Sequence, residues 1–504
     1  MTKVLIHTTL PKYAENVTKT PLLLNITGYT MPWHFGEDVL RKGKRRKMKQ
    51  GNINLTEGSI TKAIAQFSIP ILLTNLLQQL YNSIDSAVVG HFCGDAALAA
   101  VGSTGSLINL LIGFFLGLAT GAGVLFAMYY GAGDYKGLKK LIDSSMLLAV
   151  VIGVFTTFVG VVFTRQLLGI MDMSEETIAP AEEYLRIYMG GTIITLIYNV
   201  GAGLIRAEGD SIRPLIYLAI GGIGNLVMDL LAVGVLNMGV AGAAWATVFA
   251  QTITAILVVI RLCRLNPEYA FKPLHIKPDR LTVWDVVRIS VPCGLQSAMY
   301  NISNLLVQIK INSFGTAAMA GTTAYGKIDA FVYMPMAALS LAISTFVGQN
   351  IGAGKYGRMK KAIWVTLFMS IGCSLVLIGI VAVFYKDLVL IFTTDPEAIQ
   401  YGYSMLCYLL PVIWFYSFVD ILSGAIRGSG QAVSVTVICA LMICVFRIIW
   451  LEALLPIFND IRIVYLCYPI SWILCGFTLI WFYYRRSTLH KAIVANAALE
   501  KGVS

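Results

Sequence analysis

The segment GAGDYKGLKK at residues 131–140 decides the fold, because a close copy, GAGKYGRMKK, recurs at residues 352–361. The two copies are 221 residues apart, and short matching segments repeat at the same offset: Gly94 with Gly315, Ile170 with Ile391, and Arg206 with Arg427. A constant register over more than a hundred residues indicates an internal duplication. We therefore expect two halves of similar structure.

Long apolar stretches surround both copies. A bilayer core about 30 Å thick is crossed by about 20 helical residues. Twelve stretches reach that length, at residues 65–92, 97–130, 141–163, 185–205, 214–236, 240–262, 285–313, 317–350, 362–385, 401–426, 433–455 and 463–484. Because each half holds an even number of spans, both enter the membrane in the same orientation. The sequence predicts an all-α integral membrane protein, with twelve transmembrane helices in two parallel six-helix lobes related by pseudo-two-fold symmetry.

Composition excludes several other classes of protein. The 504 residues are 57% hydrophobic and 13% charged, whereas soluble domains average about 25% charged residues. The nine cysteines lie in apolar runs without a CxxC pair, so we interpret them as small buried hydrophobes and expect no cysteine metal site. The net charge of +11 is distributed between apolar segments. This pattern favours an anionic membrane surface over nucleic acid as the partner.

The positions of Lys and Arg predict the orientation of the chain, since cytoplasmic loops are enriched in both. With both termini in the cytoplasm, most of the 38 Lys and Arg residues lie on that side. The exceptions are Arg165, Arg186, Lys386 and Arg462 outside, and Lys310, Lys327 and Arg447 within spans. We expect a multi-pass protein of the cytoplasmic membrane that is in contact with lipid and is monomeric.

The sequence also predicts domain boundaries. Residues 1–52 are polar and basic without a regular pattern, so we expect a disordered extension, or an assigned start upstream of the true one at Met48; no signal peptide is expected. An N-lobe follows at 53–265, then a cytoplasmic linker at 266–284 containing Pro267, Pro273 and Pro278. A C-lobe at 285–486 and a cytoplasmic tail at 487–504 complete the chain. Two such lobes could rock against each other, which favours a transporter.

Two acids and two other polar residues lie in the apolar spans of the N-lobe. Asp85 is in the first span, Asn225 and Asp229 share one face of the fifth, and Thr247 begins the sixth. By residue count, Asp85, Asp229 and Thr247 are each about 12 Å below the outer surface. Charges in a bilayer are costly and mark functional sites. Two carboxylates, an amide and a hydroxyl suit Na⁺, or a proton shared by the acids. The alternative is that these groups only hydrogen-bond neighbouring helices.

The C-lobe lacks this set, because the offset of 221 places Phe446 and Trp450 opposite Asn225 and Asp229. It carries instead a group of aromatic, sulfur-containing and charged residues that could form a substrate cavity. An aromatic wall with an acid would bind flat organic cations, although a packed helix interface has the same composition. The predicted cavity residues are Tyr300, Tyr325, Lys327, Asp329, Met334, Tyr416 and Asp420.

With these residues in view, the chain resembles the multidrug and toxic compound extrusion (MATE) transporters over about residues 55–485. The resemblance rests on the duplicated spans, the Gly-Ala-Gly turns, the Arg-x-x-Gly turns beginning at Arg206 and Arg427, and Pro70 in the first span. Asp85, Asn225, Asp229 and Thr247 match the cation site of the prokaryotic branch that keeps this site in the N-lobe. The resemblance implies rocker-switch antiport in which the first span bends near a hinge at Pro70. Tyr300 and Tyr416 replace the acids that another branch uses in the C-lobe, and Asp420 follows one turn later.

The predicted function is a secondary antiporter that exports amphipathic, cationic drugs or metabolites in exchange for Na⁺ or H⁺, with no other cofactor. The first alternative is a flippase for a lipid-linked oligosaccharide or peptidoglycan precursor. Its cavity would need several cations for a pyrophosphate, and only Lys310, Lys327 and Arg447 are within spans. The second is a membrane-embedded enzyme, which is disfavoured because none of the five histidines lies in mid-membrane.

Overall fold

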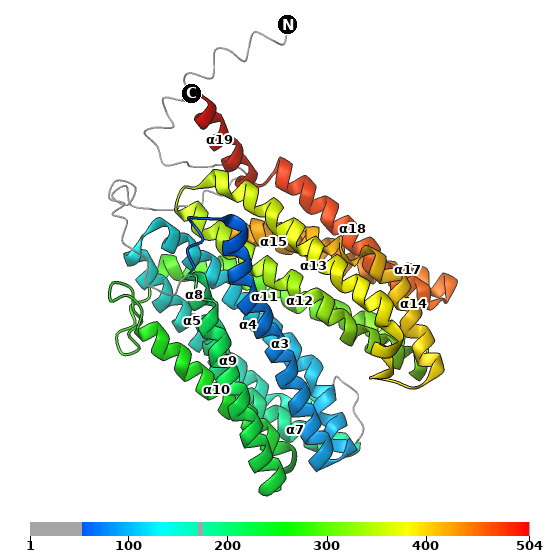
Figure 1. Ribbon diagram of the computed structural model, residues 1–504. Helices are drawn as coiled ribbons and strands as arrows, with labels where there is room; N and C mark the ends of the chain where they lie inside the picture. Colours follow the sequence, from blue (N-terminus) through cyan, green and yellow to red (C-terminus); the bar gives the residue numbers. More distant parts are fainter. Residues whose placement is uncertain (1–52, 170–174, 503–504) are drawn as a thin grey trace. The chain divides into compact units, whose positions relative to one another are not determined.

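The computed structural model describes residues 53–169 and 175–502, and the predicted N-terminal extension lies outside them. These residues fold into helices, drawn in Figure 1 from α3 in blue to α19 in red. In the N-lobe they are α3 (Ile60–Cys93), α4 (Asp95–Ala132), α5 (Tyr135–Val162), α6 (Thr164–Gly169), α7 (Glu175–Gly190), α8 (Thr192–Ala207), α9 (Ile212–Asp229), the π-helical η1 (Leu230–Val235) and α10 (Gly239–Cys263).

The C-lobe repeats this order after the linker. Its helices are α11 (Arg280–Asn312), α12 (Thr316–Gly352), α13 (Tyr356–Leu390), α14 (Pro396–Ile413), α15 (Tyr416–Gly428), α16 (Ala432–Cys439), the π-helical η2 (Ala440–Val445), α17 (Phe446–Phe458) and α18 (Ile461–Arg485). A final helix, α19 (Thr488–Gly502), follows α18.

Membrane-crossing helices account for most of the described chain. Nine helices are long and apolar enough to cross a bilayer, and two bent pairs, α7 with α8 and α14 with α15, raise the number to eleven. The remaining predicted span, the seventh at 285–313, corresponds to α11, which is long enough at 33 residues but more polar than the nine. The fourth and tenth spans, predicted as single helices, are broken by bends of 48° and 50°.

Backbone geometry repeats with the same offset as the sequence. Gly133 and Gly354, the third residues of the two Gly-Ala-Gly copies, have φ of 71° and 68°, which is the left-handed region that favours glycine. Gly133 ends α4, and Asp134 caps α5 by accepting a hydrogen bond from the Gly137 amide at 2.9 Å. The duplicated motif is therefore a tight helix–helix turn used twice.

The two lobes pack against each other mainly through α4, which lies along α11 and the end of α12. A side chain on Gly117 would place its Cβ 2.4 Å from the Cys293 carbonyl oxygen, and one on Gly131 would place it 2.0 Å from the Gln349 carbonyl oxygen. Glycine is needed at both positions because the helix backbones approach each other directly. Gly352 makes the reciprocal approach, 2.0 Å from the Met128 carbonyl oxygen.

The side-chain hydrogen bonds that join the lobes are concentrated near the end of the helices next to residues 264–279, which we call the linker side. Gln349 donates to the Ala207 carbonyl at 2.7 Å, and Asn350 donates to the Leu55 carbonyl at 3.1 Å. Lys355 donates to the Thr56 carbonyl at 2.8 Å. One bond lies farther from the linker, from Asn301 of α11 to the Asn109 carbonyl of α4 at 3.4 Å. The described structure is thus closed on the linker side.

Candidate functional site: a paired carboxylate cluster in the N-lobe

The four N-lobe residues singled out in the sequence are buried on three helices. Asp85 of α3 is 7% exposed, Asp229 at the end of α9 is 0% exposed, and Thr247 of α10 is 3% exposed. Asn225 lies one helical turn before Asp229 and is 1% exposed. Because α9 contacts both α3 and α10, three separate spans converge on these side chains.

The two acids lie against each other. The carboxyl groups of Asp85 and Asp229 are close enough to share a hydrogen bond. Yet Oδ1 of Asp85 and both carboxylate oxygens of Asp229 receive no hydrogen bond from any described residue. Two ionised carboxylates at this separation repel each other, and burial strengthens the repulsion. The pair therefore requires a shared proton or a bound cation to be stable.

Tyrosines complete the cluster. The Tyr184 hydroxyl of α7 donates to Oδ2 of Asp85 at 3.5 Å. Tyr81, one turn before Asp85 on α3, lies close to Thr247 and to both acids, and its buried hydroxyl has no hydrogen-bond partner among the described residues. Sequence reasoning missed both tyrosines, because a tyrosine in an apolar span is usually a packing residue. Tyr81 is i−4 from Asp85, a spacing that would have found it.

The backbone changes character at the site. α9 ends at Asp229, and the π-helical η1 begins at the next residue, Leu230. Isolated π-helical turns are rare and often lie at functional sites, because the extra residue rotates the following side chains. Pro70 is buried inside α3 and cannot donate a backbone hydrogen bond, which weakens the helix there. The predicted hinge is thus on the same helix as Asp85, four turns away.

The side chains predicted to form a C-lobe cavity fall into two groups. Tyr416 packs edge-to-face against Trp472 and lies 5.6 Å from Tyr333 by ring centroids. Tyr333 lies close to Asp420, and Tyr300 lies close to Tyr416. Separately, buried Tyr325 donates to Asp329 at 3.1 Å. Lys327 is exposed and Met334 half-buried. The structure thus gathers three predicted residues in one group and two in the other.

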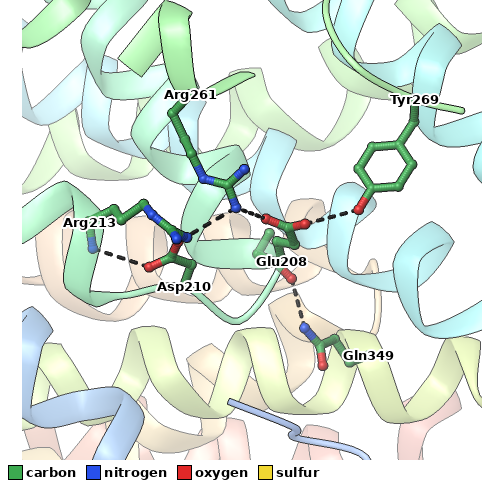
Figure 2. Close-up of polar contacts among 7 residues, drawn as sticks. Glu208, Asp210, Arg213, Arg261, Tyr269 and Gln349 are labelled. Atoms are coloured by element: carbon green, nitrogen blue, oxygen red, sulfur yellow. Dashed lines mark hydrogen bonds and ion pairs between the residues drawn. The ribbon is translucent and has the colours of Figure 1, made fainter. Parts of the chain in front are cut away.

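A second polar cluster lies on the linker side, where the lobes meet. Figure 2 shows Arg261 of α10 between Glu208 and Asp210, which follow α8. Arg261 is 2.8 Å from Glu208, and Tyr269 of the linker donates to the other Glu208 oxygen at 2.9 Å. Arg213 pairs with Asp210. The cluster itself joins the end of α8 to α10 and the linker. Gln349 of α12 in the C-lobe donates to the Ala207 carbonyl beside it, which adds a contact across the lobes.

Electrostatics and burial distinguish the linker-side cluster from the carboxylate pair. Burial and the neighbouring Glu208 carboxylate raise the pKa of Tyr269, which keeps this phenol protonated and donating. Each acid here has a cationic partner, whereas Asp85 and Asp229 have none among the described residues. The charges of the linker-side cluster are therefore balanced within the N-lobe and linker, whereas the carboxylate pair has the unbalanced charge that a cation could neutralise.

Comparisons with known proteins agree on one family. A sequence model described as MatE matches residues 70–231 and 292–466. Similar curated proteins include "Probable multidrug resistance protein YoeA" of Bacillus subtilis, 27% identical over 75% of this chain and 84% of that protein. "Multidrug export protein MepA" of Staphylococcus haemolyticus is 24% identical over 76% of this chain and 84% of that protein.

Solved structures share the fold. A MOP superfamily transporter from Pyrococcus furiosus has a TM-score of 0.82 and 23% identity, covering 88% of this chain and 99% of that one. An outward-facing multidrug resistance MATE family transporter has a TM-score of 0.80 at 23% identity, covering 88% of this chain and 100% of that one. The twelve-span arrangement of this chain is therefore shared with transporters of known structure.

Proposed function

Because the chain belongs to the MatE family, a family of membrane transporters, we propose that it exports amphipathic cationic drugs or metabolites by antiport against Na⁺ or H⁺. The matched regions fall in both lobes, which confirms the resemblance found in the sequence and the expectation that the protein is a transporter and not an enzyme. The multidrug names of the similar curated proteins support the choice of cargo.

The facing carboxyl groups of Asp85 and Asp229 are the observation that carries the antiport proposal. A proton or Na⁺ between them removes their repulsion and favours one arrangement of α3 and α9. Loss of the ion restores the repulsion, and bending of α3 near Pro70 would relieve it. Asn225 and Thr247 supply further oxygen atoms for a cation. An antiporter follows if the substrate favours the arrangement that the ion disfavours.

The closed linker side supports alternating access. Direct backbone packing at Gly131 and Gly352, and the bond from Gln349 to the Ala207 carbonyl beside the Glu208 cluster, hold the lobes together there. We propose that this arrangement is open to the outside, with both termini and the linker in the cytoplasm. The protein is proposed to work as a monomer in the cytoplasmic membrane.

The flippase alternative is not favoured. A pyrophosphate-binding cavity needs several free cations, but Lys310 pairs with Glu452 at 2.8 Å and Lys327 is exposed. Among the described residues, Arg447 is buried in mid-membrane outside such a pair, whereas Arg206, which is also buried, lies at the linker-side end of α8. One arginine does not balance the charge of a lipid pyrophosphate.

Dye efflux from vesicles tests the proposal. Membrane vesicles carrying the wild type or Asp229→Asn would be loaded with ethidium, and a Na⁺ or a proton gradient imposed separately. We expect wild-type efflux to follow one gradient and Asp229→Asn to fall to background. Asp387→Asn removes an exposed acid on α13 and serves as the matched control. Folded wild-type protein that moves dye under neither gradient would refute the proposal.

A further inference from the structure

A buried arginine in the C-lobe takes no part in the proposed ion coupling. Arg447 lies on α17 and is 4% exposed. It stands twelve residues before Asn459, which ends the helix, so it lies about 18 Å from that end, near the middle of a bilayer. None of the ion pairs among the described residues includes Arg447.

Neutral groups hold the guanidinium in place. Its Nε donates to the Ser471 hydroxyl at 3.0 Å, and its Nη1 donates to the Asn304 side-chain oxygen at 3.1 Å. The guanidinium carbon lies 4.3 Å from the centre of the Tyr468 ring. These contacts fix the orientation of the planar group but leave its charge without a counter-ion. A charge at this depth usually has a partner, and a carboxylate matches the guanidinium geometry best.

The internal repeat places this arginine beside the position of Asn225, one turn from that of Asp229. The offset of 221 puts Tyr468 at the position of Thr247 and Phe446, the neighbour of Arg447, at the position of Asn225. Each group also adjoins a π-helical turn, since η1 follows Asp229 and η2 ends two residues before Arg447. Each lobe therefore holds a polar group inside the membrane, acidic in the N-lobe and, about one helical turn deeper, basic in the C-lobe.

Access to the arginine runs along α11. Asn304, the partner of Nη1, is exposed and lies one turn after Tyr300 and Asn301. Asn301 contacts the Asn109 carbonyl of α4, across the boundary between the lobes. A molecule bound beside α11 between the lobes would therefore meet Asn304 first and reach Arg447 by displacing or joining that hydrogen bond.

We propose that Arg447, with Asn304, binds the carboxylate of zwitterionic amphipathic substrates. The inference rests on the proposed export function and assigns the residues that would recognise the carboxylate of a substrate carrying both an amine and an acid. A lipid headgroup is a poor source of the anion, because headgroups lie at the membrane surface and the arginine lies near mid-bilayer. Bidentate pairing with a planar carboxylate explains why arginine and not lysine occupies the position.

A matched pair of dyes isolates the carboxylate. Rhodamine B carries a free carboxyl group and a delocalised cation, and its ethyl ester lacks only the acid. We would measure gradient-driven transport of both in vesicles, and binding of both to detergent-purified full-length protein by fluorescence anisotropy. In Arg447→Gln we expect binding and transport of rhodamine B to fall about tenfold while the ester changes less than about twofold. Arg447→Lys should recover part of the loss.

The control removes an equal charge from the same lobe. Arg462 lies on the exposed surface of α18, with 65% of its side chain accessible. Arg462→Gln should leave the binding and transport of both dyes unchanged. Equal losses for the two dyes in a folded Arg447→Gln protein would show a structural role and overturn the proposal, as would unchanged rhodamine B binding. If the wild type transports neither dye, the export proposal fails. The binding measurement then still decides the role of Arg447. Weaker rhodamine B binding in Arg447→Gln supports the proposal, and unchanged binding overturns it.

Discussion

The two lobes derive from one repeat, yet they bury different chemistry inside the membrane, at positions about one helical turn apart in the repeat. The N-lobe buries Asp85 against Asp229, and the C-lobe buries Arg447 over Tyr468. Their turns and interlobe glycines are matched, as Gly131 and Gly352 approach the opposite lobe equally closely. The parts that shape the backbone have therefore stayed alike, and the polar groups in mid-membrane have diverged. Under the two proposals made above, ion coupling lies in the first lobe and substrate recognition in the second.

The largest expected effect concerns the N-lobe acids. We expect substrate to displace the coupling ion from wild-type protein, which a proton-sensitive dye or a Na⁺ electrode would detect in weakly buffered detergent solution. The double variant Asp85→Asn/Asp229→Asn should release no ion, because no charge remains to bind one. The C-lobe acid variant Asp329→Asn should keep the release at saturating substrate. Equal loss in both would remove the distinction between the lobes.

A second difference lies on the linker side. The N-lobe pair of Arg261 and Glu208 corresponds to Phe482 and Ser429 in the C-lobe, so only the first lobe has a buried ion pair there. Arg261→Gln leaves Glu208 with Tyr269 alone and should lower stability by about 3 kcal/mol, measured by chemical or thermal unfolding. Glu208→Gln/Arg261→Gln should recover much of the loss, because no buried charge is left unpaired. A double variant as unstable as the single one would show that the ion pair itself stabilises.

The matched glycines provide a symmetrical test. Gly131→Ala and Gly352→Ala would each force a methyl group against a backbone oxygen of the other lobe. We expect each to lower the free energy of unfolding by about 2 kcal/mol, because overpacked interfaces must shift apart. Gly372→Ala has open space around the new methyl group and should be neutral. Clearly unequal effects at the two glycines would show that the lobe contact is less symmetrical than its backbone.

The smallest expected effect is a change in ion affinity when the tyrosine of a tyrosine–acid pair is replaced, and it should differ between the two lobes. Tyr184→Phe removes a long hydrogen bond to Asp85 of 3.5 Å, and we expect a two- to threefold change in the apparent affinity for the coupling ion. Tyr325→Phe removes a shorter bond of 3.1 Å to Asp329 in the C-lobe and should leave ion affinity unchanged. Titration of dye efflux against Na⁺ or pH would measure both. An ion-affinity change in Tyr325→Phe alone would place coupling in the C-lobe.

Local sequence patterns predicted the spans and the turns well. Apolar length locates each membrane helix because the bilayer sets a minimum length, and the Gly-Ala-Gly copies locate turns that need a left-handed residue at Gly133 and Gly354. The sequence did not predict the bends between α7 and α8 or between α14 and α15. Both bends occur inside apolar runs, where hydropathy is the same for a straight and a broken helix.

By itself the sequence determined the duplication, the membrane-spanning architecture and the acids that do not belong in lipid. Each of these follows from spacing along one chain or from the cost of burying a charge. Tertiary structure alone decided that Asp85 faces Asp229 with no donor to their facing oxygens among the described residues, that Tyr81 and Tyr184 join them, and that Arg447 has only neutral partners. These contacts join residues from separate helices, and the rotation of each helix about its axis is set by packing against its neighbours, which no single span encodes.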